Sequence, residues 1–497
     1  MNNQIQIRFV LISIILFLAV STLSAQTPEQ LTEEKQLQQL YSGYRGVSPD
    51  YLHAGKKAIE QFQDLKYGLR IHWGIYSEWA IEASWDVRNK FDNDKREQYY
   101  GLVNQFNPCD FDPEEWMKLF KELGFTFFTI TTKHHDGFSL FDTKTRVKKC
   151  WDWNAQGGPK IIDCNTSFSI MDTPYKKDII KQLTDAAGKH GLKIDLYFSH
   201  PDWFDADQRF DLWHPLKGTP ICDDYNKESD PAGYWRFMKR HRQQITELLS
   251  NYGTIDMMCL DMKFPEWAQQ DLIDTIKVVR KIQPNVMFRR RGINEYGDYT
   301  TPERWYPAGQ DDPRVTMPWL AIDPVARTFA YDPDATKYRD DKRLLSTLIK
   351  VVSTGGNFSP AIGPDASGKF HPKVIEYLHI VGRWLKVNGE AIYKTRPWYW
   401  FSQGESIRFT RSRDSDFVYA ILMDWPGNTL ALDGIQPKTG AKITLLADPD
   451  KTSLSWSFSN QKLLFDNLGD TPPHGEHAWV LKIPVEKGTL QSRTPAG

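Results

Sequence analysis

The sequence predicts an α/β fold, a (β/α)8-like TIM barrel followed by a C-terminal antiparallel β-sandwich. Strand-like and helix-like segments alternate from about Lys66 to Pro397, which favours a parallel sheet closed into a barrel. Polar or charged residues recur where the predicted strands end, and a barrel would gather them at one mouth. After Pro397, short apolar runs alternate with Gly, Pro, Asn and Asp, a pattern typical of an antiparallel β-domain.

Hydrophobic periodicity and terminal residues define the barrel elements in chain order. Asp112-Pro113 is a start signal for the first of the main helices, and Gly191 is a stop signal for the second. We expect strands over residues 68–73, 125–132, 192–199, 255–260 and 285–288, and helices over 113–123, 175–190, 233–252, 272–282 and 342–353, the last followed by a loop at 355–357.

The C-terminal part shows no helical periodicity. We expect strands over residues 407–410, 417–422, 443–446 and 479–483. A chain of 497 residues is too long for one small core, so two folded domains are the natural expectation. We therefore divide the chain into a segment at 1–25, a barrel with an N-terminal leader at 26–397 and a β-sandwich at 398–497.

The charge composition of the chain argues against partners that bind through a strongly charged surface. The net charge is -1 and no long block of one sign occurs, so neither a nucleic acid nor a membrane surface is indicated. The chain holds 18 Trp, 21 Tyr and 27 Phe. Flat rings stack on the apolar faces of sugars, although most aromatic residues in any protein lie in the core.

The first 25 residues have the pattern of a secretory signal peptide. Arg8 precedes an apolar run from Phe9 to Val20, and small residues lead to Ala25, near which we expect cleavage. The run is short for a membrane anchor, and no second hydrophobic segment follows. We expect an exported protein, periplasmic or secreted, with no membrane span once the signal is removed.

The chain has five cysteines and no CxxC motif, which argues against a zinc site built on thiolates. In an oxidising compartment Cys150 and Cys164 could bridge a loop. One sequence does not determine the pairing.

His134 and His135 stand directly after an apolar run. Side chains alternate along a strand, so two neighbouring histidines both reach a ligand only where the strand ends and the backbone turns. Asp136-Gly137 supplies that turn. Neutral or cationic imidazoles suit sugar hydroxyls. With Asp136 or Asp261 as a further ligand or orienting group they would also suit a metallohydrolase.

Two carboxylates on separate loops are what retaining glycoside hydrolysis requires. Asp261 ends the apolar run 255–260, a costly position unless the carboxylate is partnered or catalytic, with a helix cap or an ion pair as the structural alternative. Glu303 follows in a Thr-Pro-Glu loop, with Glu295 as a rival acid. A general acid in this role is expected to have a raised pKa.

Five segments in order resemble glycoside hydrolase family 29, the α-L-fucosidases. The first runs from Tyr67 to Ser77 and resembles the family's KFGxFIHWGxYS strand, and the second, from Leu123 to Phe138, resembles AKYxxLTTKHHDGF. The other three are residues 195–199 (GLYYS in the family), 355–364 (GGNxLLNIGP) and 384–393 (WLxxNGEAIYxT).

The resemblance implies roles at the matching positions. Asp261 matches the nucleophile, and Glu303 matches the acid/base of members with a TPE-type loop. The sugar-contacting positions match His72, His134, His135, Trp85 and Tyr197. A substrate arginine matches Arg290 or Arg291, depending on whether it is counted from Gly292 or from Glu303. The chain departs from the family where Met262 replaces the glycine after the nucleophile and Phe288 replaces the Asn before the arginine.

The resemblance implies a retaining exo-α-L-fucosidase that acts on fucosylated glycans and needs neither a metal nor another cofactor, and the N-terminal segment adds the expectation that it is exported. Fucose is 6-deoxy-L-galactose, so an α-L-galactosidase or related exo-glycosidase on the same scaffold is an alternative. A non-catalytic glycan-binding relative is another, although both carboxylates are present.

Overall fold

The computed structural model describes residues 47–48, 50–307, 312, 317–334, 336, 341–472 and 474–486. The predicted signal peptide lies outside these residues. Among the helices of the described part, none combines the length and apolar character needed to cross a membrane.

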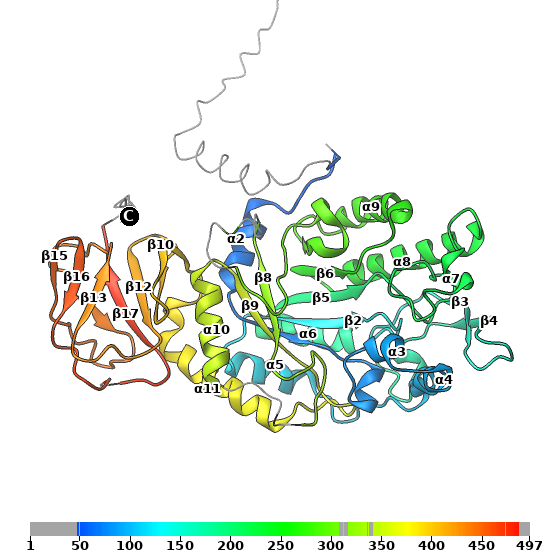
Figure 1. Ribbon diagram of the computed structural model, residues 1–497, viewed down its shortest axis with the longest axis horizontal. Helices are drawn as coiled ribbons and strands as arrows, with labels where there is room; N and C mark the ends of the chain where they lie inside the picture. The colour runs from blue at the N-terminus through cyan, green and yellow to red at the C-terminus, as the bar shows by residue number, and fades with distance from the viewer. Residues whose placement is uncertain are drawn as a thin grey trace, which may run out of the picture.

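A curled, all-parallel sheet forms the centre of the larger region (Figure 1). Its seven strands run in the order β7-β6-β5-β2-β1-β9-β8. Their bounds are β1 (Gly68–Ile71), β2 (Phe127–Lys133), β5 (Lys193–Ser199), β6 (Met257–Asp261), β7 (Met287–Phe288), β8 (Leu320–Pro324) and β9 (Asn357–Ile362). This sheet and the domain that follows it confirm the predicted fold class.

Residues 299–303 lie between the two edge strands of this sheet. Tyr299 makes a parallel bridge to Arg289, which directly follows β7, and Thr300 makes one to Trp319, which directly precedes β8. Glu303 bridges Ile322 within β8. The segment predicted as the Glu303 loop therefore connects the sheet's edges and closes the barrel.

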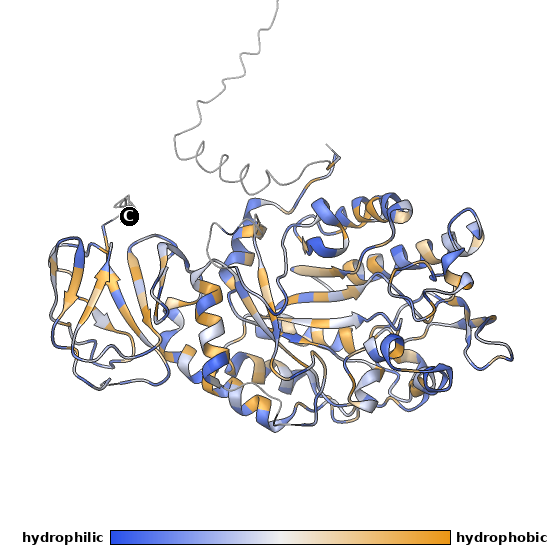
Figure 2. Ribbon diagram, viewed as in Figure 1, coloured by the Kyte–Doolittle hydropathy of each residue, from blue (hydrophilic) through white to orange (hydrophobic). Residues whose placement is uncertain are grey.

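Amphipathic helices cover the outside of the sheet, with their apolar faces turned toward it (Figure 2). Side chains of Asp112, Asp178 and Asp230 cap the N-termini of α5, α6 and α8 by accepting hydrogen bonds from the first turn. The main helices are α2 (Lys56–Leu65), α5 (Pro113–Glu122), α6 (Ile179–His190), α8 (Pro231–Asn251), α9 (Glu266–Arg280), α10 (Asp341–Ser353) and α11 (Pro372–Asn388).

Several short elements were not predicted. The barrel loops carry α3 (Trp85–Asn89), α4 (Asn93–Gly101), α7 (Pro220–Asp223) and the antiparallel hairpin of β3 (Val147–Asp152) and β4 (Lys160–Thr166). Short 3-10 turns occupy 75–79, 102–104, 170–172, 290–292, 294–296 and 389–391. Cys150 and Cys164 lie on the two hairpin strands and are free thiols in this structure.

The C-terminal domain consists of two antiparallel sheets around one apolar core. A five-stranded sheet has the order β10-β11-β12-β17-β14, and a three-stranded sheet the order β13-β16-β15. The strands are β10 (Arg396–Gln403), β11 (Ile407–Arg411), β12 (Phe417–Leu422), β13 (Leu430–Asp433), β14 (Thr444–Leu445), β15 (Ser457–Ser459), β16 (Lys462–Phe465) and β17 (Trp479–Pro484).

The five-stranded sheet is apolar on both faces. Along β12, Val418, Ala420 and Leu422 join the core between the two sheets, whereas Tyr419 and Ile421 join the core of the barrel. Helix α10 packs against β10 and β11, and Trp384 of α11 donates to the backbone oxygen of Ala478 at 2.8 Å. The domain is thus fused to the barrel through a continuous apolar contact.

The floor of the barrel, at the N-terminal ends of the strands, is covered by α2. Phe62 and Leu65 of this helix form an apolar cluster with Phe127, Met257 and Met287, each the first residue of its strand or close to it. A cavity of about 500 Å³ lies beside this cluster, lined by α2 and by the segments that lead into β6 and β7. The polar residues singled out from the sequence all lie at the other end.

Candidate active site

A small pocket opens at the mouth of the barrel, where the strands end. Its volume is about 70 Å³. It brings together eight of the nine residues singled out from the sequence, among them both carboxylates. The complete lining is Arg70, His72, Glu82, Ala83, Trp85, His134, His135, Tyr197, Asp261, Arg291, Glu303 and Phe329.

Asp261 is the last residue of β6 and is only 6% exposed. The hydroxyl of Tyr197 donates to its Oδ2 at 2.6 Å. Its Oδ1 is buried and accepts no hydrogen bond from the described part of the chain. One carboxylate oxygen is therefore fixed, while the other remains available to a reacting atom.

Two arginines link Asp261 to Glu303. Arg289 lies 3.7 Å from Oδ1 of Asp261 and donates to Oε1 of Glu303 at 2.6 Å. Arg291 lies 3.5 Å from the same Asp261 oxygen and donates to the same Glu303 oxygen at 2.5 Å. Because each guanidinium reaches both carboxylates, the two acids stand close to one another at the mouth.

The arginines determine the ionisation of both acids. Burial alone would raise the pKa of Asp261, but Arg291 and Arg289 outweigh it and hold that pKa well below its usual range. The pKa of Glu303 is likewise lowered, since the same two cations outweigh burial and the charge of Asp261. The expectation of a raised pKa at Glu303 is therefore wrong.

The three histidines of the pocket are buried and neutral. Burial lowers the pKa of His72 and His134 well below the usual range and that of His135 to about 4. Hydroxyl groups hold their Nδ1 atoms: Thr131 at 3.2 Å from His72, Ser84 beside His134, and Ser199 at 2.5 Å from His135. Their Nε2 edges remain for a ligand or for neighbours such as Arg70, which donates to His72.

Aromatic rings shape the walls of the pocket. Tyr197 stacks on His134 with the ring centroids 5.5 Å apart, and Trp85 meets His135 edge to face at 4.8 Å. Trp85 also contacts Trp213, which is 43% exposed beside the mouth. These contacts set the orientation of the histidines.

The run Arg289-Arg290-Arg291 divides between the pocket and the surface. Arg289 directly follows β7 and is buried. The 3-10 turn over Arg290–Gly292 then returns the chain so that Arg291 lines the pocket. Arg290 points away from the pocket and pairs with Glu295 at 2.9 Å. The structure thus separates both Arg290 and the rival acid Glu295 from the lining, and Arg289, which was not among the predicted site residues, takes the inner place.

Met262 follows Asp261 with a left-handed backbone, φ 70°. This region is unfavourable for residues that carry a Cβ. The family's glycine at this position would adopt the same turn without strain. Met262 is 7% exposed, so its side chain is buried beside the nucleophile position.

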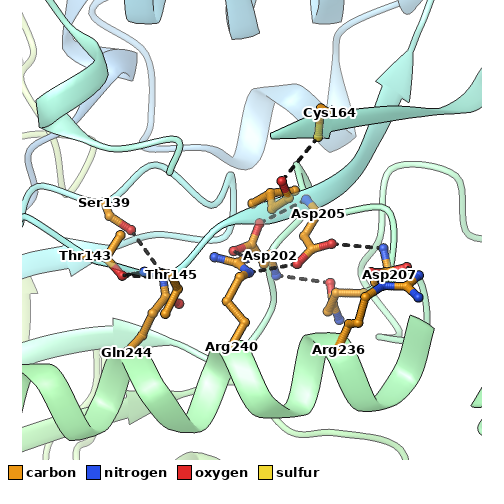
Figure 3. A network of polar contacts seen from close by, with 12 residues as sticks. Ser139, Thr143, Thr145, Cys164, Asp202, Asp205, Asp207, Arg236, Arg240 and Gln244 are labelled. Atoms are coloured by element: carbon orange, nitrogen blue, oxygen red, sulfur yellow. Dashed lines mark hydrogen bonds and ion pairs between the residues drawn. The ribbon is translucent and has the colours of Figure 1, made fainter. Parts of the chain in front are cut away.

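A buried polar network supports the loop after β5 (Figure 3). Arg240 of α8 pairs with Asp202 and, at 2.8 Å, with Asp205, while Lys133 pairs with Asp202 at 3.3 Å. The backbone NH of Trp203 in this loop donates to the backbone oxygen of His135 at 2.8 Å. The network therefore fixes the backbone that presents His135.

Sequence reasoning missed Arg70, Glu82 and Phe329 in the lining. Arg70 had a visible signal, since it is a charged residue inside the apolar strand β1. Glu82 and Phe329 come from loops without periodicity. Within the described residues, no group of three or more His, Cys, Asp or Glu side chains is arranged to hold a metal ion.

Two family models match the chain. The model described as alpha-L-fucosidase matches residues 37–390, and that of the alpha-L-fucosidase C-terminal domain matches residues 402–484. The tissue alpha-L-fucosidase of Homo sapiens is 26% identical over 468 residues, which cover 88% of this chain and 92% of the human one. The human plasma alpha-L-fucosidase is 25% identical, with 73% and 76% covered.

Solved structures share the fold. Alpha-L-fucosidase isoenzyme 1 from Paenibacillus thiaminolyticus superposes with a TM-score of 0.73 at 26% identity, covering 87% of this chain and 99% of its own. A trapped covalent intermediate of the GH29 alpha-L-fucosidase from Bacteroides thetaiotaomicron superposes with a TM-score of 0.72 at 23% identity, covering 88% and 99%.

Proposed function

Since the chain belongs to the α-L-fucosidase family and is a glycoside hydrolase, we propose that it is a retaining exo-α-L-fucosidase acting by double displacement. The observation that carries the proposal is the pair of carboxylates, Asp261 and Glu303, bridged by the same two arginines in a pocket at the barrel mouth. A small pocket at the barrel mouth suits a single terminal sugar.

In the first step, Oδ1 of Asp261 attacks C1 of the terminal fucose, and the bond from C1 to the leaving oxygen breaks. Glu303 gives its proton to that oxygen. The product is a fucosyl ester of Asp261 and a free aglycone. The low pKa of Asp261 keeps the nucleophile ionised, and the Tyr197 hydroxyl orients it.

In the second step, Glu303 takes a proton from water, and the water oxygen attacks C1 and releases Asp261. Glu303 must carry a proton at the start, although the two arginines favour its ionised form. The side chain of Arg291 is 44% exposed, whereas that of Arg289 is 1% exposed, so Arg291 is the cation on the side from which a sugar enters. A sugar that enters between the acids displaces Arg291 from Glu303, and the loss of this cation raises the pKa of the acid.

The neutral histidines bind the ring hydroxyls. Imidazole nitrogens can donate or accept, so they match hydroxyl groups without adding charge to the pocket. The Nδ1 partners Thr131, Ser84 and Ser199 fix the rings. The Nε2 edges of His134 and His135 meet the sugar, whereas Nε2 of His72 accepts a hydrogen bond from Arg70.

The test is hydrolysis of an aryl α-L-fucoside, with the anomer of the released fucose followed by proton NMR. We expect the α-anomer first, because two inversions retain configuration. Glu295→Gln is the matched control for Glu303→Gln, since Glu295 lies outside the pocket and pairs with Arg290. Release of the β-anomer, or wild-type rates for Asp261→Asn, would sink the mechanism.

We also propose that the enzyme is exported through the N-terminal segment 1–25 and works in the periplasm or outside the cell. The support is the sequence pattern of that segment. N-terminal sequencing of the protein recovered from cell fractions tests this. A mature protein that begins near residue 26 is expected, and one that retains Met1 in the cytoplasm would contradict it.

A further inference from the structure

Arg70 is a buried cation in the lining of the active-site pocket. It lies on β1, is 4% exposed and lines the pocket with both carboxylates. Its Nε donates to Nε2 of His72 at 3.2 Å, and its two Nη atoms lie 4.0 and 3.9 Å from Sγ of Cys259. Within the described part of the chain, no carboxylate lies within ion-pair distance of this guanidinium.

The charged groups around Arg70 are engaged elsewhere. Asp261 and Glu303 are each held by Arg289 and Arg291. Asp195 is buried on β5, accepts a hydrogen bond from Thr129 at 2.7 Å and forms no ion pair with Arg70. The nearby histidines are neutral. The guanidinium of Arg70 lies over the ring of Tyr197, with 4.9 Å to the ring centroid, and its Nε donates to His72. Its two Nη atoms have only the weak sulfur contacts and no oxygen partner among the described residues.

An unpaired buried guanidinium is costly, because arginine stays charged and five donors need partners. The KFGxFIHWG pattern that the segment from Tyr67 to Ser77 resembles has Phe at the position of Arg70, so a strand of this pattern does not itself require the charge. Arg70 is a buried cation in the lining of a ligand pocket, and the fold does not require it. This indicates that its anionic partner is a group on the ligand.

We propose that Arg70 binds an anionic group at C6 of the pocket's sugar, either a sulfate ester on O6 of an α-L-galactoside or the carboxylate of the corresponding uronic acid. This rests on the proposed function, and it makes the neutral fucoside the lesser substrate. The planar fork of arginine matches both oxyanions with two parallel hydrogen bonds. C6 is the position because an anion there leaves every ring hydroxyl free for His72, His134 and His135.

The test is calorimetric binding of aryl 1-thio-α-L-glycosides, which resist hydrolysis. The three ligands are the neutral fucoside, the galactoside 6-sulfate and the galactosiduronate. We expect at least one anionic ligand to bind about tenfold or more tightly than the fucoside, as a charge-assisted contact requires. The two anionic arms decide between sulfate and carboxylate.

Arg70→Phe restores the family's residue and should reverse the preference. Arg70→Lys keeps the charge but loses the fork, so it should retain only part of the preference and serves if the Phe variant does not fold. Arg413→Met removes a surface cation that pairs with Glu60 and Asp64, far from the pocket, and should leave the ratio unchanged.

Tighter binding of the neutral fucoside by the wild type would overturn the inference. So would an unchanged ratio in both Arg70 variants, which would mean that Arg70 serves only Cys259. Hydrolysis of the matching O-glycosides is measured separately. If none is cleaved while the anionic preference stands, the proposed function fails; if the fucoside is cleaved while the preference is absent, the inference alone fails.

Discussion

The two ends of the barrel are built from the same strands and have opposite chemistry. Strand β2 begins with Phe127 in the apolar floor cluster and leads into His134 at the mouth, and β6 runs from Met257 in that cluster to Asp261. At the floor, α2 buries apolar side chains against strand starts. At the mouth, arginines and carboxylates are buried beside a pocket.

The difference separates stability from chemistry. Apolar burial at the floor contributes favourable free energy of folding, whereas buried charges at the mouth offset part of that gain. Substitutions at the mouth should therefore change the reaction far more than the free energy of unfolding, and substitutions at the floor should do the reverse.

The largest effect is expected at Asp261. Asp261→Asn removes the nucleophile but keeps the shape, so kcat/KM for an aryl α-L-fucoside should fall by about 10⁴-fold. The midpoint of thermal unfolding should stay near that of the wild type. Activity within a few-fold of wild type would show that Asp261 is not the nucleophile.

The next effect is expected at Glu303. Glu303→Gln should lower kcat/KM by about 10³-fold for a glycan with a poor leaving group, because it removes the general acid. The loss should be smaller for an aryl fucoside, whose phenol leaves without protonation. Equal losses for both substrates, or a similar loss in Glu295→Gln, would move the acid role away from Glu303.

At the floor, Phe62→Ala should lower the free energy of unfolding by about 3 kcal/mol, since it opens a cavity in a packed aromatic site. Phe62 is 2% exposed and packs on Tyr299 with the ring centroids 4.9 Å apart. Denaturant unfolding measures the loss, and kcat of the folded fraction should stay within about twofold of wild type. A large loss of kcat would show that packing at the floor of the barrel also affects the reaction at its mouth.

A smaller effect concerns pH. The free enzyme needs Asp261 ionised and Glu303 protonated, and both pKa values are lowered, so kcat/KM should be highest at acidic pH and fall once pH rises past the pKa of Glu303. Arg291→Met removes one cation, raises the pKa of both acids and should move this falling limb up by about one pH unit. If the falling limb of the kcat/KM profile stayed in place or moved to lower pH, Arg291 would not be the group that lowers the pKa of Glu303.

The smallest effect is expected at Met262, whose φ is 70°. Met262→Gly and Met262→Ala both delete the buried side chain and differ only in the Cβ. The Gly variant should be more stable than the Ala variant by about 1 kcal/mol, because a left-handed backbone is strained only when a Cβ is present. Equal unfolding midpoints would show that the turn carries no strain.

The prediction from the sequence was most accurate for strands in which an apolar run ends in polar residues. Strands β2, β5 and β6 are apolar runs that end in polar residues, and their ends carry His134, His135 and Asp261 to the pocket. Segment 299–303 was predicted as a loop because it lacks apolar alternation, yet its backbone bridges the two edge strands. Its place depends on partners far away in the chain, which no local pattern contains.

The arginine run shows another limit. Three identical residues give no signal for which of them faces inward, and the choice depends on a short turn that begins at Arg290. The pKa of Glu303 was predicted in the wrong direction for the same reason, since the two guanidiniums beside it are placed by that turn.

The contact between the C-terminal domain and the barrel has a consequence for how the protein can be produced. A gene shortened after codon 397 would yield a barrel whose apolar surface on α10 and α11, normally covered by β10, β11 and β17, faces water. Such a surface favours self-association, so most of the shortened protein should be recovered in the insoluble fraction after recombinant expression. The change of sequence pattern at Pro397 therefore marks a boundary between two types of secondary structure, and the protein cannot be divided there without exposing this apolar contact.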